Sequence, residues 1–211
     1  MSKKILLLAC ATIICVFSLR AQSSSKLYLE LNYGAILFSQ NLSVFDNSFT
    51  TSRYTSNELA IAYGMSDSSA LGIKLLTSGY ELPENSELIG LNFVGLMARI
   101  NRPIHLNGEL VIKPFLEASL GCTFLTDNFS IDAEKYETKR YGYGFEVAVG
   151  FNVPLTKFLE IGMKCGEFVS FLGSPKVDVD VPAKDYKFGE QMILAPRIMG
   201  TISINLFGFR K

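Results

Sequence analysis

The sequence has little of what most catalytic and nucleic-acid-binding proteins depend on. It contains one His and no Trp, its 20 basic and 20 acidic residues cancel, and only 19% of its residues are charged. Soluble domains average roughly 25% charged residues. With no charge excess and no Lys/Arg cluster, a strongly basic nucleic-acid binder is not expected. Four Cys in 211 residues exclude a disulfide-stapled miniprotein.

The chain is also not disordered, because 48% of its residues are hydrophobic and it has no long polar tract. Two classes remain, a soluble β-rich domain and a membrane protein. Past residue 22 there is no apolar stretch of 18 residues or more, so the sequence predicts no transmembrane helix in that part of the chain.

The first 21 residues have the features of a secretory signal peptide. Lys3 and Lys4 precede an apolar run of about 15 residues, and Ala21 ends a short cleavage motif. We expect cleavage after Ala21, which leaves residues 22–211 as one exported domain with a net charge of −3. Two alternatives stay open, a lipoprotein with a lipidated Cys10 and an uncleaved anchor helix.

The rest of the chain alternates with a period of two. In residues 141–153 the odd positions are Tyr, Phe and Val, while the even positions hold small or polar residues such as Glu146. This pattern is typical of a strand, because successive side chains point to opposite faces, whereas a helix repeats every three or four residues. Most such segments reach the roughly 9 to 11 residues that cross a bilayer at a tilt. The alternation predicts eight strands near residues 26–38, 55–66, 69–80, 87–102, 108–125, 139–153, 157–171 and 191–209.

One predicted strand departs from this alternation. Residues 88–102 are apolar on both faces for most of their length. We expect a β-bulge near Gly95, because an extra residue in one strand shifts the side chains from one face to the other.

The connections alternate in length, as they do in outer-membrane barrels. Short turns are expected at 65–69, 102–108 and 154–157. Long polar loops are expected at 39–54, 126–138 and 172–190. If the signal peptide places the N-terminus in the periplasm, the short turns are periplasmic and the long loops extracellular.

The last strand, Ile198 to Phe209, alternates and ends in an aromatic residue, although Arg210 and Lys211 follow it. In its strands and loops, the chain resembles the small eight-stranded outer-membrane barrels of Gram-negative bacteria, of the OmpX-like and OmpA transmembrane-domain type. The resemblance covers residues 22–211 and rests on no sequence motif. It implies an all-β, up-and-down transmembrane barrel in the bacterial outer membrane, assembled by the barrel-assembly machinery and surrounded by outer-membrane lipid.

Proteins of this type serve as structural proteins, adhesins, small-solute conduits or accessory parts of secretion machinery. The resemblance therefore implies a surface or secretion-machinery partner for the three long loops, and no nucleic acid.

If the Leu, Ile and Val side chains face lipid, the opposite face of each strand points into the barrel. Arg99 joins the inward charges if its strand is bulged. Burying an isolated charge costs several kcal/mol, so these groups are expected to pair. Such a balanced set predicts an interior filled by side chains; a narrow conduit, or charges that face water at the barrel ends, stay open. The predicted interior charge network is Glu30, Glu58, Lys74, Lys113, Glu117, Glu146, Glu160, Lys164 and Arg197.

The sequence offers little for catalysis. His105 is expected in a periplasmic turn without a nearby Ser, and no G-x-S-x-G or H-E-x-x-H pattern occurs. Asp178 and Asp180 lie in the last long loop, where a solvated mixed-charge segment is favoured over a divalent-cation site. We therefore expect a non-enzymatic barrel without cofactor or metal. A narrow small-solute conduit, a lipid-modifying enzyme and a soluble lipocalin-like barrel are the alternatives.

Cys122 and Cys165 fall on lipid-facing positions of strands that are separated by one other strand. Two strand spacings of about 4.8 Å exceed the roughly 7 Å reach of a disulfide, so two free thiols are expected. Aromatic side chains near strand ends predict girdles at the headgroup level, with ordinary β-propensity as the alternative explanation. These residues are Tyr28, Tyr33, Tyr63, Tyr80, Tyr141, Tyr143, Phe207 and Phe209.

Overall fold

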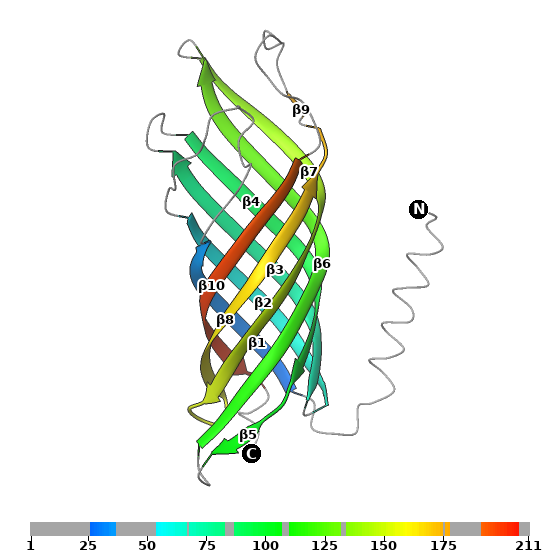
Figure 1. Ribbon diagram of the computed structural model, residues 1–211, viewed down its shortest axis with the longest axis vertical. Coiled ribbons are helices and arrows are strands. Elements are labelled where there is room, and N and C mark those ends of the chain that lie inside the picture. Colours follow the sequence, from blue (N-terminus) through cyan, green and yellow to red (C-terminus); the bar gives the residue numbers. More distant parts are fainter. Residues whose placement is uncertain are drawn as a thin grey trace, which may run out of the picture.

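The computed structural model of the chain is shown in Figure 1. It describes residues 26–36, 54–66, 68–82, 87–106, 110–131, 134–174, 176–177 and 191–206. The predicted signal peptide lies outside the described residues. Within them, no helix is long and apolar enough to span a membrane. The strands are β1 (Lys26–Ile36), β2 (Tyr54–Ser66), β3 (Ser69–Leu82), β4 (Glu87–Asn101), β5 (Ile104–Leu106), β6 (Leu110–Ile131), β7 (Glu134–Pro154), β8 (Leu159–Leu172), β9 (Lys176–Val177) and β10 (Gln191–Asn205).

Eight of these strands form a closed ring. Each ring strand pairs antiparallel with the ring strands before and after it in the chain, and β1 pairs with β10 to close the barrel. The short strand β5 continues the pairing of β4 along β6 in the same register, and β9 continues the pairing of β8 along β7. The predicted all-β, eight-stranded, antiparallel up-and-down barrel is therefore confirmed.

The strands are strongly tilted, as Figure 1 shows. A row of directly paired outward residues can be followed around the barrel from Leu31 on β1 to Met192 on β10. The residue of β10 that pairs with Leu31 itself is Ile202, which lies ten residues after Met192. After one full turn around the barrel, the row of paired residues is therefore displaced by ten residues toward the end that carries the β6–β7 hairpin. A displacement of this size in an eight-stranded barrel requires the strands to tilt by about 40° from the barrel axis. The row consists of Leu31, Leu59, Leu75, Val94, Cys122, Tyr143, Phe171 and Met192.

The side chains that alternate in the sequence point alternately into the barrel and away from it. On β6, Glu117 is buried in the interior while its neighbour Leu116 is exposed on the outer surface. The outer surface is therefore a continuous apolar belt, and the interior holds most of the buried polar side chains. Exposed members of the belt include Leu31, Ile61, Ile73, Leu96, Leu120, Val147, Val149, Ile161, Met163, Ile198 and Ile202.

The bulge expected near Gly95 is wrong. Strand β4 pairs with β3 and with β6 in continuous register. Its inward residues Leu91, Phe93 and Met97 are apolar because they pack inside the barrel, while Val94 and the other outward residues belong to the belt. The strand is apolar on both faces because one end of the interior is itself apolar.

The long loop expected at 126–138 is also wrong. Strands β6 and β7 continue as a two-stranded hairpin, paired up to Ile131 and Glu134. This hairpin extends past the last β4 pair, Ile89 with Asp127, and projects beyond the neighbouring strands in Figure 1. Polar composition suggested a loop there, but the pairing of the two strands continues into it.

Other expected connections differ less from the structure. The turn at 102–108 contains strand β5, which pairs with the start of β6. In the segment 172–190, Leu172 ends β8 and β9 pairs with β7. Residues 37–53, 178–190 and 207–211 lie outside the described residues. Strand β10 ends at Asn205, and the expected aromatic end of the last strand, Phe207 and Phe209, is among the residues not described.

Candidate functional site

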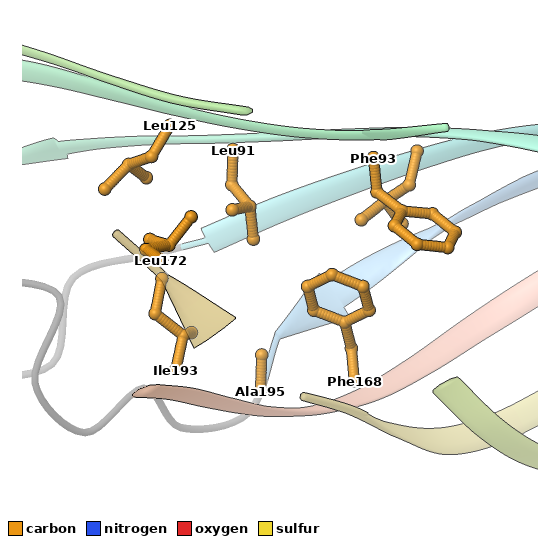
Figure 2. Packing of buried hydrophobic residues seen from close by; sticks show 8 residues of the cluster. Leu91, Phe93, Leu125, Phe168, Leu172, Ile193 and Ala195 are labelled. Atoms are coloured by element: carbon orange, nitrogen blue, oxygen red, sulfur yellow. The ribbon is translucent and has the colours of Figure 1, made fainter. Parts of the chain in front are cut away.

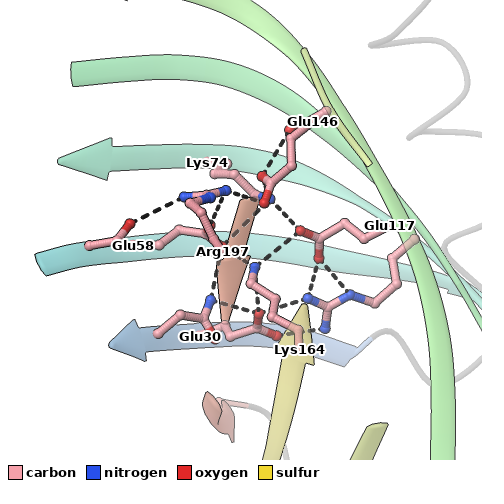
Figure 3. A network of polar contacts seen from close by, with 11 residues as sticks. Glu30, Glu58, Lys74, Glu117, Glu146, Lys164 and Arg197 are labelled. Atoms are coloured by element: carbon pink, nitrogen blue, oxygen red, sulfur yellow. Dashed lines mark hydrogen bonds and ion pairs between the residues drawn. The ribbon is translucent and has the colours of Figure 1, made fainter. Parts of the chain in front are cut away.

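The interior of the barrel holds a network of charged side chains, shown in Figure 3. Each of the eight ring strands contributes one of them, and all are at least nine-tenths buried. Four are carboxylates and four are cations, so the charges balance. In strand order the members are Glu30, Glu58, Lys74, Arg99, Glu117, Glu146, Lys164 and Arg197.

Lys74 on β3 connects three carboxylates. Its Nζ donates to Glu146 Oε2 at 2.7 Å and to Glu117 Oε1, and lies 3.5 Å from Glu58 Oε1. These carboxylates come from β7, β6 and β2. An ammonium group can donate three hydrogen bonds and accepts none, so its position among three acceptors satisfies it.

Arg99 on β4 contacts two carboxylates through its guanidinium group. Its two terminal nitrogens donate to the two oxygens of Glu30 at 2.6 and 2.7 Å. Its Nε donates to Glu117 at 2.9 Å, and its Cζ lies 4.2 Å from the ring centroid of Phe115. Fork-like pairing of this kind is specific to a guanidinium group, which is planar and fixed in its donor directions.

Lys164 and Arg197 complete the network. Lys164 Nζ donates to Glu58 and, at 3.2 Å, to Glu117. Arg197 donates to Glu146, and one of its terminal nitrogens lies 3.5 Å from Glu58 Oε2. Asn32 donates to both Glu30 and Glu58 at 2.9 Å. Each charge of the network therefore has an opposite charge within reach, which buried ions require.

The structure brings seven of the nine predicted network residues together and places the other two apart. Lys113 and Glu160 form a pair of their own, closer to the short-turn end and partly exposed. Arg99 joins the network without the bulge on which its place was predicted to depend.

The predicted network was confined to charged residues in the middle of the strands, and it left out Asn32 and Arg140. Asn32 faces inward by its even position on β1, and Arg140 is 2% exposed and alternates with the outward Tyr141. The alternation could have identified both, because it fixes the face for uncharged residues and strand ends as well.

A second layer of the interior is apolar. On β3, β4, β6, β8 and β10 its side chains lie closer to the β6–β7 hairpin end than the network residue of the same strand. Phe93 and Phe168 meet edge to face, with ring centroids 5.3 Å apart, and Figure 2 shows the group. The guanidinium of Arg197 lies 5.6 Å from the Phe168 ring and joins the two layers. The apolar layer consists of Leu76, Leu91, Phe93, Leu125, Phe168, Leu172, Ile193 and Ala195.

Of the residues considered for catalysis, only His105 lies in the described part of the chain. His105 lies on β5, whose three residues are exposed, and Asp178 and Asp180 lie outside the described residues. In the described part of the chain, no group of three or more His, Cys, Asp or Glu residues is arranged to hold a metal ion. Cys122 and Cys165 are free and exposed on the outer surface, which confirms the prediction of two free thiols.

Comparison with known proteins adds evidence for the fold. No family model matches the chain, and no curated protein matches it. Among solved structures, Neisserial surface protein A is similar over 87% of this chain and 98% of its own, with a TM-score of 0.52 and 13% identity. The attachment invasion locus protein Ail of Yersinia pestis covers 85% and 97% at TM-score 0.43 and 9% identity. The outer membrane protein OprG from Pseudomonas aeruginosa covers 85% and 94% at TM-score 0.46 and 9% identity. The chain thus has the fold of the small outer-membrane barrels that its strand pattern resembled.

Proposed function

We propose that the chain is a non-enzymatic integral protein of the bacterial outer membrane. Its barrel is closed by its own side chains, and it acts through the segments at the β6–β7 hairpin end. Its role lies in envelope structure, in adhesion or as an accessory partner of another surface protein.

The distribution of polarity supports the membrane location. A soluble barrel buries apolar side chains and exposes polar ones, whereas here Leu120 is 63% exposed and Lys74 is fully buried. Closed barrels are one of two structures that satisfy every backbone group in lipid, and outer-membrane barrels carry an outward apolar band about 25 Å tall. This pattern argues against the lipocalin-like alternative.

One observation supports the proposal that the interior is closed by side chains. Every ring strand sends one charged side chain into the same network, and the apolar layer lies next to it on the side of the hairpin. An eight-stranded barrel leaves an interior just wide enough for side chains to fill. An ion that entered the barrel would meet no net attraction from the network, because its charges balance and are paired. It would also find no polar group to coordinate it among the side chains of the apolar layer.

Recording across planar bilayers tests the closed interior. The purified full chain is expected to give no steady conductance, while an open porin reconstituted in parallel gives steady channels. Steady conductance from the chain would overturn the closed interior and favour the narrow-conduit alternative.

Fractionation of cells tests the location independently. The chain is expected in the outer-membrane fraction, extractable only with detergent, and with a gel mobility that changes on heating. Recovery from the soluble periplasm without detergent would overturn the membrane proposal.

A further inference from the structure

One row of inward residues leads from the short-turn end of the barrel to the charge network. Its members lie on β6, β7, β8, β10, β1 and β2, and each pairs directly with the next. Because such rows are displaced toward the hairpin end as they pass around the barrel, this row rises from the partly exposed Lys113 to the buried Glu58. We name it the polar row, and in order it consists of Lys113, Asn152, Gly162, Thr201, Asn32 and Glu58.

Three side-chain oxygens of the polar row have no hydrogen-bond partner among the described residues. They are Asn152 Oδ1, Thr201 Oγ1 and Asn32 Oδ1, and all three residues are more than nine-tenths buried. The orientation of the Asn32 amide is fixed, because its Nδ2 donates to Glu30 and Glu58 and its Oδ1 is therefore turned away from both carboxylates. Buried acceptors of this kind are in most proteins bonded either to another protein group or to ordered water.

The middle member of the polar row, Gly162, has no side chain. Asn152 Oδ1 lies only 2.3 Å from the point that a Cβ of Gly162 would occupy, so it extends across this residue toward the next strand, which carries Thr201. The Thr201 hydroxyl could donate to either amide oxygen of the row, yet it forms no such bond. A water molecule between these groups donates two hydrogen bonds and accepts one from the hydroxyl. A bridge of this kind is nearly as favourable as a direct hydrogen bond.

Solvent reaches the first member of the row from the short-turn end. The side chains of Lys113 and Glu160 are 27% and 13% exposed, and Asn152 pairs with Lys113 on the neighbouring strand. The first unpaired oxygen therefore belongs to a strand about 4.8 Å from a solvated side chain. Further acceptors follow on β10 and β1, so that each water molecule along the row has a protein partner, as buried water requires.

The same row becomes apolar beyond the network. After Glu58 it continues through Leu76 and Phe93, which belong to the apolar layer. Thr123 pairs with Phe93, and its buried Oγ1 also has no partner among the described residues. Its neighbours on the inward face include Phe93 and Leu125, and a cavity lined by apolar side chains stays dry.

We propose that the polar row binds a line of ordered water that enters at the short-turn end and stops at Glu58. The interior is then wet on one side of the network and dry on the other. Through Asn32, this water brings the network into contact with the solvent at the short-turn end. The inference rests on the closed interior proposed above, because an open conduit would hold water along its whole length.

Two isosteric changes on the same row test the water. Thr201→Val removes a hydroxyl that water bridges, and it is expected to lower the urea midpoint by about 0.5 M. Thr123→Val is the matched control. It removes a buried hydroxyl that has no partner, and it is expected to leave the midpoint unchanged or to raise it. A Thr201→Val midpoint that stays unchanged or rises would overturn the water row, because a dry, unpaired hydroxyl costs stability.

Nuclear magnetic resonance of the full chain in detergent micelles reads the hydration without any substitution. Magnetisation transfer from water is expected to reach the methyl group of Thr201 and not that of Thr123. Transfer to neither methyl group overturns the water row and leaves the closed interior standing. Transfer to both overturns the one-sided filling, whereas steady conductance across planar bilayers overturns the closed interior itself.

Discussion

Arg99 and Glu30 face each other through two hydrogen bonds of 2.6 and 2.7 Å, although their strands, β4 and β1, are separated by two other strands of the ring. The pair therefore ties together parts of the barrel that no backbone pairing connects. Both side chains are buried in the interior of the barrel.

Arg99→Met is expected to destabilise the barrel by about 3 to 5 kcal/mol, because it leaves Glu30 and Glu117 with fewer partners in a buried site. Unfolding in urea, followed in vesicles by the fluorescence of the nine Tyr residues, measures this loss, since the chain has no Trp. Lys113→Gln is the control. Its pair with Glu160 is partly exposed and is expected to contribute about 1 kcal/mol or less.

The same pair is expected to be coupled in a double variant. Glu30→Gln combined with Arg99→Met is expected to cost less than the sum of the two single changes, with a coupling of about 0.5 to 3 kcal/mol. Two losses that simply add would show that the residues do not act as a pair.

The faces of the network residues were predictable, but their partners were not. Alternation alone assigns Glu117 and Glu146 to the inward face. Which cation reaches them depends on the ten-residue climb of the pairing rows around the barrel, which sets the relative heights of distant strands. Lys113 and Glu160 illustrate the difference, because they have the correct face but lie too close to the short-turn end to join the network.

The errors also have physical causes. Apolar residues on both faces of β4 were attributed to a bulge because an apolar inner layer was not anticipated. The polar residues at 126–138 predict a loop, yet β6 and β7 stay paired through this segment up to Ile131 and Glu134. Polar composition therefore does not distinguish such a hairpin from a loop.

Gly144 is expected to resist substitution. A Cβ placed there would lie 2.6 Å from Thr123 Oγ1 and 2.9 Å from Phe168 Cζ, in the packed interior. Gly144→Ala is therefore expected to cost about 1 to 3 kcal/mol through overpacking. Gly90→Ala is the matched control, because nothing lies within 4 Å of its added Cβ. Equal urea midpoints for the two variants would contradict the packing described for Phe168.

His105, Asp178 and Asp180 are the best candidates for an enzymatic role, and we expect them to have none. The triple variant His105→Ala, Asp178→Asn, Asp180→Asn is expected to leave the lipid composition of the envelope unchanged by mass spectrometry. His105 is exposed on β5, so its change is expected to alter stability by less than about 0.5 kcal/mol. A shift in acyl-chain or headgroup composition, reversed by the unchanged chain, would revive the lipid-modifying alternative.

The β6–β7 hairpin is expected to be dispensable for folding and necessary for surface contacts. Thr126 and Lys139 are directly paired, so residues 127–138 can be replaced by Asn-Gly, the two residues that best close an antiparallel pair. The shortened barrel keeps the network and the apolar layer, and its heat-dependent gel mobility is expected to match that of the full chain. Cells that carry it are expected to lose whatever adhesion or partner binding the full chain confers. A shortened chain that fails to insert would show that the hairpin belongs to the folding unit, and unchanged adhesion would remove the hairpin from the proposed function.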